Sequence, residues 1–284
     1  GINHNGNFEV LDELIRSSAS AGGDILKLQL FNTKKRIGKN VKELKYNEKA
    51  QYTEENIKDI LETSELTFEE IKKALSLIKD LGKESMCSGF SLDDFKFLIS
   101  IGIKNLKVAS MDFNNIIIHD FLSTLSSEYK IFISTGMSSI EEINLILDIY
   151  SNSKCELVIL HCTSSYPLPY EDVNLSVLSR LKNSLPESIA IGYSDHTVDN
   201  RTPIAALHYG ISYLEKHFTL DKNMRGPDHF QSMTHDELLD LIHELEIHAK
   251  IKGNGRKRLQ SSEFEAWRTQ KKSMYAAKKI KNGE

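Results

Sequence analysis

Two histidines stand just past the ends of two successive apolar runs. His196 follows the run in IGYSDHT, and His217 follows the run in YLEKHF. If these runs are neighbouring strands, both imidazoles can reach one ion. Two neutral imidazoles with oxygen ligands suit a first-row divalent ion in octahedral geometry, whereas zinc normally takes a third strong protein ligand. The alternative, that the two histidines serve packing alone, stays open at this point.

Carboxylates stand close to both histidines in the sequence. Asp195 precedes His196, Glu215 lies two positions before His217, and Asp228 follows in the next loop. Carboxylates in such positions can orient a metal-bound imidazole or transfer a proton. The sequence therefore predicts a metal site with acid and base groups nearby.

Polar side chains also interrupt other apolar runs near their carboxyl ends. Several hydroxyls and two ammonium groups at one edge of a sheet suit a phosphate and a carboxylate. The candidates are Lys27, Ser88, Lys107, Ser110, Ser134 and Ser194. Each has a structural explanation by itself, since Lys27 can extend its charge to solvent and Ser134 can cap a helix. The whole set is harder to explain by packing.

Short β-rich runs that alternate with helical patterns must position these side chains. Strands are predicted at 25–31, 84–88, 104–110, 130–135, 156–162, 188–194 and 212–218, and Gly1–His4 is predicted as the end of an eighth. Helix starts are predicted where a hydroxyl stands three residues before an acid, at Thr67, Ser91, Ser138 and Thr234. This alternation predicts an α/β protein with a (β/α)8 TIM barrel, whose active site lies at the carboxyl ends of the strands.

Two segments depart from the alternation. Residues 32–66 form a long polar connection with one short helix predicted at Ile57–Leu61, and such a connection is either a binding loop or a disordered insertion. Residues 252–284 are basic and weakly periodic, and the apolar run at 274–280 resembles the start of a strand. We therefore predict a barrel catalytic domain at 1–251, followed at 252–284 by a linker and the start of a second domain.

The composition excludes several classes of protein. The 284 residues are 40% hydrophobic and 27% charged, as in ordinary globular chains. No apolar run approaches the roughly 18 residues of a membrane helix, so we expect no membrane partner. A net charge of −4 gives no general attraction to nucleic acid. Three cysteines without CxxC spacing indicate neither a disulfide framework nor a zinc knuckle, which favours a cytoplasmic location.

Seven motifs carry a resemblance to a known family. They are GINHNG, AGGDILKLQLF, KVAS, STGMSSIEEI, LHCTSSYPLPYEDVNL, IGYSDHT and LEKHFTLDKNMRGPDH. In order and spacing they resemble the sialic acid synthase family, the bacterial nonulosonic acid synthases. The resemblance implies a barrel followed by a small antifreeze-like (SAF) domain, truncated here after AAKKIKNGE, and a homodimer in the full-length protein. It also leads us to expect little activity from this chain by itself.

The resemblance implies a condensation of phosphoenolpyruvate with an N-acylated hexosamine, giving a nonulosonic acid and phosphate. The sugar would be N-acetylmannosamine or a diacetamido-trideoxyhexose. By residue matching, His196 and His217 hold a divalent ion, Mn2+ or else Mg2+ or Co2+, that activates the sugar aldehyde. Lys27 and Ser88 match positions that contact the phosphoenolpyruvate carboxylate. The positions that match phosphate contacts are Lys107, Ser110, Ser134 and Ser194.

The same matching gives roles to the remaining candidates. Asp112 and Glu215 are the predicted catalytic carboxylates, although the family commonly has a glutamate where Asp112 stands. Gln29 is expected beside the metal. Tyr166 and Asp228 match sugar-contacting positions, and Ser164 replaces an asparagine of some members, which leaves the identity of the sugar open.

Two other functions compete with this one. A metal-dependent aldolase on the same fold would use free pyruvate and would not need the serine-rich phosphate site. A sugar-binding homologue without catalytic activity would share the fold, which does not by itself define a function. Release of phosphate from phosphoenolpyruvate separates the synthase from the aldolase, and the presence of both histidines and both lysines argues against the inactive homologue.

Overall fold

Seven parallel strands run in sequence order through the described part of the chain. The computed structural model describes residues 1–36 and 57–283, and each strand there pairs with the next one. The strands are β1 (Ile25–Leu30), β2 (Glu84–Gly89), β3 (Asn105–Val108), β4 (Lys130–Ser134), β5 (Glu156–Cys162), β6 (Ala190–Asp195) and β7 (Tyr213–Lys216). The seven strands predicted after residue 20 are confirmed, with ends that differ by at most two residues.

The sheet is curled, because side chains of β1, β3 and β4 reach β7. Lys27 Nζ lies 2.5 Å from Glu215 Oε1, and Lys107 Nζ lies 3.1 Å from Glu215 Oε2. The Phe132 ring meets the Tyr213 ring edge to face, with centroids 5.0 Å apart. In a flat sheet with strands about 4.8 Å apart, the first and seventh strands would be separated by roughly 29 Å. The sheet therefore encloses an interior, as the predicted barrel requires.

Alternation along each strand divides its side chains between helices and interior. Leu26, Leu28 and Leu30 of β1 belong to the main apolar core between the strands and the helices, whereas Lys27 points inward. A smaller apolar cluster lies inside the barrel and consists of Met86, Phe132, Val158 and Leu160. Polar residues lie two positions further along the same strand faces, as Ser88 does after Met86. The interior is thus apolar at one end and polar at the carboxyl end of the strands.

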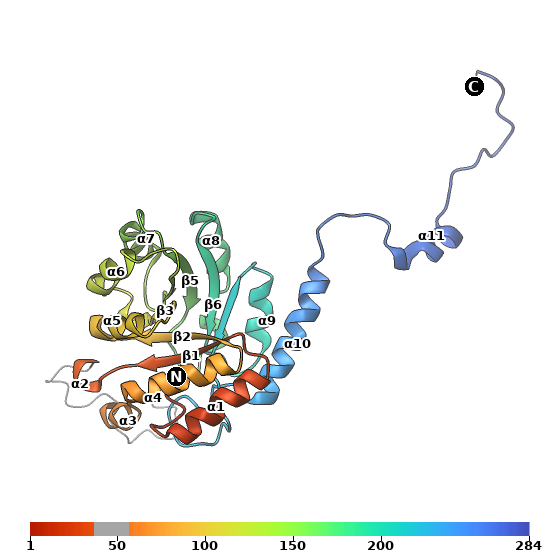
Figure 1. Cartoon of the computed structure of the whole chain (residues 1–284). Helices are drawn as coiled ribbons and strands as arrows, with labels where there is room; N and C mark the ends of the chain where they lie inside the picture. Colours follow the sequence, from red (N-terminus) through yellow and green to blue (C-terminus); the bar gives the residue numbers. More distant parts are fainter. Residues whose placement is uncertain (37–56, 284) are drawn as a thin grey trace. The chain divides into compact units, whose positions relative to one another are not determined.

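Helices connect the strands and lie outside them (Figure 1). Those around the barrel are α1 (Phe8–Ser20), α4 (Phe68–Asp80), α5 (Leu92–Ser100), α6 (Ile116–Ser123), α7 (Ile140–Ile149), α8 (Ser176–Ser184), α9 (Arg201–Leu207) and α10 (His235–Lys252). Short 3-10 turns follow β3 and β5, namely η1 (Ser110–Asp112) and η2 (Tyr170–Asp172). No helix in residues 1–36 and 57–283 combines the length and the apolar character needed to cross a membrane.

Side-chain caps fix where several helices begin. Thr67 forms a capping box at α4, and Ser91 Oγ accepts from the third backbone N–H of α5, as predicted. The predicted start of α7 is wrong by one residue, since Ser139 caps this helix. Ser138 Oγ instead donates to the carbonyl of Thr135, so its hydroxyl is already engaged in the preceding turn.

The predicted strand at Gly1–His4 is not observed. These residues form turns, in which Asn5 N–H donates to Ile2 O at 2.9 Å and Asn5 has a φ of 50°. The side chain of Asn3 donates to Phe218 O at 2.7 Å just past β7. The segment therefore lies next to the end of β7 through a side chain, without the backbone ladder of a strand.

The long connection after β1 is described only at its two ends. It contains α2 (Thr33–Arg36) and α3 (Ile57–Thr63), and the second confirms the short helix predicted near Ile57. The rest of the predicted loop, 37–56, lies outside the described residues.

The chain divides into two compact units, Gly1–His248 and Ala249–Glu284. The second unit contains η3 (Ser261–Glu263) and α11 (Phe264–Gln270). Its residues 271–283 are in neither helix nor strand, so the strand expected at 274–280 is not observed. The start of an antifreeze-like domain in this unit stays a prediction from the sequence.

Phe132 provides a test of the barrel interior. Its side chain is 1% exposed, and its removal leaves a cavity between β4 and β7. Phe132→Ala should lower the free energy of unfolding by about 3 to 5 kcal/mol, measured by urea denaturation. Ile117→Ala is the control, since Ile117 is 68% exposed and the change should cost less than about 0.5 kcal/mol. Equal losses in both variants would contradict the enclosed interior.

Candidate active site

Glu215 lies at the centre of the polar end of the barrel. Its carboxylate contacts Lys27 Nζ of β1 at 2.5 Å and Lys107 Nζ of β3 at 3.1 Å. Ser194 Oγ of β6 donates to Glu215 Oε1 at 3.3 Å. Four strands therefore meet at one carboxylate, and β7 is held to β1 and β3 across the interior by charge.

Burial and the neighbouring charges shift the pKa values of Glu215 and Lys107. Burial alone would raise the pKa of Glu215, but attraction to Lys107 and Lys27 outweighs burial and holds it well below its usual value. Burial lowers the pKa of Lys107, and Glu215 opposes that change. At neutral pH Glu215 is consequently a carboxylate that accepts hydrogen bonds and has no proton to donate.

The predicted serines surround the lysines on neighbouring strands. Ser88 of β2 is in register with Lys107, and it is 1% exposed. Ser134 ends β4 and is 2% exposed, and its Oγ has no hydrogen-bond partner among residues 1–36 and 57–283. A buried hydroxyl without a partner is uncommon, so Ser134 is suited to donate to a ligand.

Ser110 and Ser164 join this group from two loops. Ser164 Oγ donates to Ser110 Oγ at 2.7 Å. Gly136, with a φ of +44°, allows their approach, because a Cβ there would lie 2.3 Å from Ser110 Cβ and 2.7 Å from Ser164 Oγ. Sequence analysis did not single out Gly136, although a glycine directly after Ser134 and Thr135 at a strand end was a usable signal.

The two predicted metal ligands lie side by side. The ring centroids of His196 and His217 are 5.6 Å apart. Burial lowers the pKa of His196 to about 4, and burial followed by repulsion from His196 holds the pKa of His217 well below 6.5. Both rings are therefore neutral at physiological pH, which is the form that binds metal.

The loop after β5 holds His196 on two sides. His196 Nδ1 lies 2.8 Å from the carbonyl of Thr163, and Leu168 N–H donates to His196 O at 3.0 Å. Since Nδ1 donates to this carbonyl, the lone pair of the neutral ring is on Nε2. Tyr166 of the same loop packs on His196, with centroids 4.1 Å apart. A residue predicted to contact the sugar thus touches a residue predicted to bind the metal.

Three other predicted residues take different positions around this centre. Asp228 is 6% exposed, and its Oδ2 lies 3.7 Å from His217 Nδ1. Gln29 is on β1, in register with Ser88 and on the same strand face as Lys27. Asp112 ends the 3-10 turn after β3, and burial raises its pKa while Arg36 opposes this. Of the two predicted catalytic carboxyls, Asp112 keeps a proton more readily than Glu215.

Asp195 does not lie with the imidazoles, although it precedes His196 in sequence. It is the last residue of β6, and its carboxylate pairs with Lys216 on the outer side of the sheet. Adjacent residues of a strand face opposite sides, so Asp195 cannot share the face of His196. Asp195 therefore does not orient the imidazole of His196 by direct contact, because its carboxylate is engaged by Lys216.

The donor set fits a divalent ion that retains water or substrate ligands. In residues 1–36 and 57–283, no group of three or more histidine, cysteine or carboxylate side chains is arranged to hold a metal. At such a site His196 and His217 would supply two nitrogen ligands, and water or substrate would fill the remaining positions. That arrangement suits Mn2+ or Mg2+ better than a closed zinc site.

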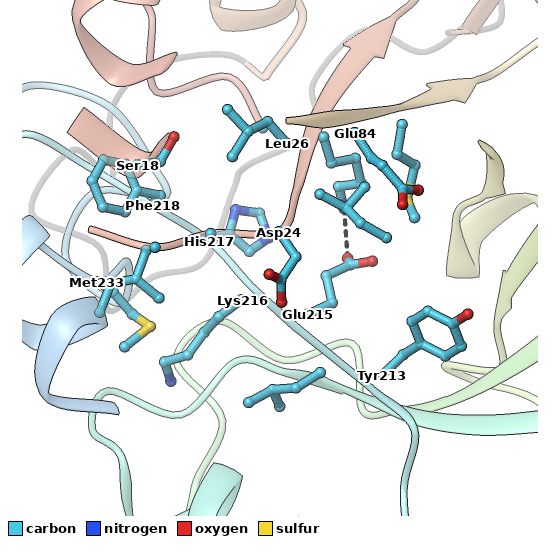
Figure 2. A pocket seen from close by; sticks show the side chains of 18 of the residues that line it. Ser18, Asp24, Leu26, Glu84, Tyr213, Glu215, Lys216, His217, Phe218 and Met233 are labelled. Atoms are coloured by element: carbon cyan, nitrogen blue, oxygen red, sulfur yellow. Dashed lines mark hydrogen bonds and ion pairs between the residues drawn. The ribbon is translucent and has the colours of Figure 1, made fainter. Parts of the chain in front are cut away.

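A cavity of about 600 Å³ opens between β1 and β7, which are the two ends of the hydrogen-bonded sheet. Glu215, Lys216 and His217 all line it, and the side chain of Lys216 points away from those of the other two (Figure 2). Of the predicted site residues, Lys27, Glu215 and His217 line this cavity, which also reaches apolar residues of α1 and α10 such as Leu11 and Leu241.

Comparison with known proteins supports the resemblance seen in the motifs. The chain is 34% identical over 270 residues to an N,N'-diacetyllegionaminic acid synthase of Legionella pneumophila, covering 93% of this chain and 74% of that protein. It is 33% identical over 287 residues to the Campylobacter jejuni synthase of the same name, covering 100% of this chain and 85% of that protein. Both relatives are named as synthases, and the expectation of an enzyme is confirmed.

A solved structure and a family model agree with these relatives. The N-acetylneuraminic acid synthetase of Leptospira borgpetersenii, crystallised with citrate, superposes with a TM-score of 0.82 at 28% identity, covering 95% of this chain and 90% of that one. The predicted barrel fold is thereby confirmed. The model of the NeuB family matches residues 14–257. The chain belongs to the NeuB family.

Proposed function

We propose that the protein condenses phosphoenolpyruvate with an N-acylated hexosamine to give a nonulosonic acid and inorganic phosphate. The observation that carries the proposal is the cluster of Lys27, Lys107 and Glu215, ringed by serine hydroxyls at the carboxyl end of the barrel. Two positive charges and one negative charge leave one net positive charge, which favours an anionic substrate. The named activities of the relatives agree with a sugar acid as the product.

The lysines and serines divide between the two anionic groups of phosphoenolpyruvate. Lys27 and Ser88 would bind its carboxylate. Lys107, with the unpartnered hydroxyl of Ser134, would bind its phosphate. The remaining hydroxyls of that subsite belong to Ser110 and Ser194. Charge-assisted hydrogen bonds of this kind fix orientation as well as supply affinity.

The sugar would enter as its open-chain aldehyde beside Tyr166 and the two histidines. Bound at the imidazoles, a divalent ion such as Mn2+ supplies a Lewis acid that polarises the aldehyde oxygen. The methylene carbon of phosphoenolpyruvate forms a bond to the aldehyde carbon while the carbonyl π bond breaks and its oxygen takes up a proton. Water then adds to the resulting cationic carbon and gives up a proton. The bond from that carbon to the phosphate oxygen then breaks, and phosphate leaves.

The two predicted catalytic carboxyls have different proton affinities. Glu215 is held as a carboxylate by Lys107 and Lys27, so it can accept hydrogen bonds from the adding water or from the lysines. Burial raises the pKa of Asp112, which makes it the better candidate to give and take a proton. Catalytic acid and base pairs typically consist of two groups whose surroundings shift their pKa values in opposite directions.

Lys107 tests the phosphoenolpyruvate site. Lys107→Met should weaken phosphoenolpyruvate binding by about 1.5 to 3 kcal/mol, or roughly ten- to 150-fold, because a charge-assisted contact is lost. Calorimetric titration with phosphoenolpyruvate measures the change. Lys104→Met is the matched control, since Lys104 immediately precedes β3, pairs with Glu128 at 2.7 Å and is 44% exposed. Unchanged affinity in Lys107→Met would remove Lys107 from the site.

The reaction itself separates the competing functions. The complete gene product is mixed with phosphoenolpyruvate and each candidate hexosamine, and phosphate release and product mass are measured. Phosphate released only when a sugar is present supports the proposal. Conversion of free pyruvate without phosphate release indicates the aldolase, and no turnover with any sugar indicates a binding protein.

His217 tests whether the histidine pair binds metal or only packs. His217→Ala should leave the barrel folded and lower Mn2+ affinity strongly, because one imidazole with water ligands is a weak site. Calorimetry with Mn2+ and circular dichroism measure the two effects. If the histidines only pack, His217→Ala should instead lower stability and leave Mn2+ binding intact.

The buried imidazoles also predict a dependence of stability on pH. The pKa of His196 falls from 6.5 in the unfolded chain to about 4 in the fold, so the unfolded state binds more protons in this window. The free energy of unfolding of the metal-free protein should therefore decrease as pH drops from about 6.5 to 4. His196 alone would contribute up to roughly 3 kcal/mol.

Replacement of His196 isolates its contribution. His196→Gln should reduce the slope of unfolding free energy against pH in this window, measured by urea denaturation at several pH values. His235→Gln, at a side chain 40% exposed, is the control and should leave the slope as it is. A slope that is the same in all three proteins would show that His196 is not buried as a neutral ring.

A further inference from the structure

A buried ion pair joins β6 to β7 directly beside the two histidines. Lys216 Nζ contacts Asp195 Oδ2, and the side chains are 6% and 0% exposed respectively. The two residues are register partners on the adjacent strands. Lys216 also donates to the carbonyl of Thr197 at 2.7 Å and to that of Asp199 at 3.1 Å. One ammonium group therefore holds β7 to β6 and to the loop that follows β6.

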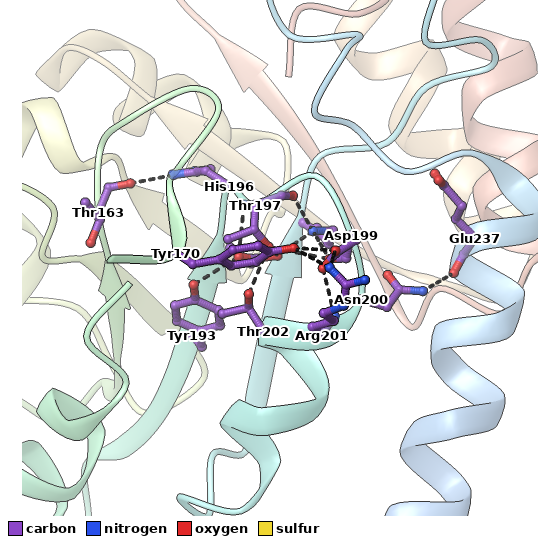
Figure 3. A network of polar contacts seen from close by, with 12 residues as sticks. Thr163, Tyr170, Tyr193, His196, Thr197, Asp199, Asn200, Arg201, Thr202 and Glu237 are labelled. Carbon is purple, nitrogen blue, oxygen red and sulfur yellow. Dashed lines mark hydrogen bonds and ion pairs between the residues drawn. The ribbon is translucent and has the colours of Figure 1, made fainter. Parts of the chain in front are cut away.

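Asp195 is equally well supplied with donors. Its carboxylate accepts from Tyr193 OH at 2.9 Å, from Thr197 N–H at 3.1 Å and from Thr197 Oγ1 at 2.9 Å. Tyr193, Thr197 and Thr202 lie together in this network, and Tyr170, Asp199 and Arg201 continue it toward the loop after β5 (Figure 3). These hydrogen bonds fix the orientation of the Asp195 carboxylate toward Lys216, in addition to the attraction between the two charges.

Each member of the pair immediately precedes one of the histidines. Asp195 precedes His196, and Lys216 precedes His217. Because neighbouring residues of an extended chain face opposite sides, the pair lies outside the barrel while the imidazoles lie inside. A slip of one residue between β6 and β7 would turn an imidazole away from the interior. The ion pair opposes such a slip directly before both histidines, and so it keeps both imidazoles facing the interior.

Folding stability alone does not explain why this charge pair is buried. Charges removed from water carry a large desolvation penalty, and well-packed apolar residues of similar size are often as stable or more stable. By contrast, the register pair Lys130 and Glu156 at the amino ends of β4 and β5 has side chains 29% and 62% exposed. The burial of Asp195 and Lys216 is best explained by a need for a fixed register between β6 and β7 and a fixed direction of their side chains.

We propose that Asp195 and Lys216 are positioning residues that align His196 and His217 for one divalent ion. This inference rests on the metal site of the proposed function. It predicts that removing the pair weakens metal binding without removing either ligand, because the imidazoles lose their fixed separation. Loss of supporting contacts of this kind typically costs ten- to a hundredfold in metal affinity.

The test is a Mn2+ titration by calorimetry without substrate. The double variant Asp195→Asn/Lys216→Met leaves no unpaired buried charge, and it should bind Mn2+ ten- to a hundredfold more weakly while its circular dichroism stays that of the wild type. The single variant Lys216→Arg keeps the charge pair and should retain most of the wild-type affinity for Mn2+. Lys130→Met/Glu156→Gln is the matched control, since Lys130 also contacts β7, through Tyr213 OH at 2.9 Å, at the end away from the histidines.

The outcomes separate this inference from the function on which it rests. Wild-type affinity in the double variant, or an equal loss in the control, overturns the positioning role and leaves the metal site standing. A wild type that binds no Mn2+ overturns both. If the double variant fails to fold, Asp195→Glu decides, since it keeps both charges but displaces the carboxylate by one methylene. A tenfold loss there supports the role, and full affinity overturns it.

Discussion

Mutual compensation of charge inside the barrel is the constraint on which the site depends. Lys107 is 3% exposed and lies beyond the reach of bulk water, so its charge requires a partner. Glu215 supplies it, and the same carboxylate also holds Lys27. These contacts join β1 and β3 to β7 across the interior, so the charge pairs that compensate one another also hold the curled sheet together. Fold and site are therefore stabilised by the same three side chains.

Much of the fold could be predicted because its signals are local. Apolar runs of strand length, such as ELVILHC at β5, have one interpretation when helical patterns flank them. Caps are equally local, and Thr67 and Ser91 begin their helices as predicted. Where two hydroxyls stand side by side, as at Ser138 and Ser139, the choice depends on the preceding turn. Sequence patterns do not resolve that choice.

The candidate residues could be named from the sequence, but their partners could not. The lysines, serines and histidines are identified by being polar within apolar runs and by the family motifs. That Glu215 contacts both lysines, or that Thr163 O accepts from His196, depends on how the sheet curls and how a loop folds back. Asp195 shows the limit most clearly, because closeness in sequence suggested a role beside the imidazoles and strand alternation places it on the other face.

The two-sided hold of the β5 loop on His196 has a consequence for how such enzymes can diversify. Thr163 O, Leu168 N–H and the ring of Tyr166 all contact His196. An insertion or deletion between Thr163 and Leu168 would therefore displace His196, the proposed metal ligand, while it reshaped the proposed sugar pocket. Under the proposed function, changes in sugar preference are then expected as exchanges of side chains at constant loop length, as at Ser164. The catalytic centre and the specificity loop must evolve together.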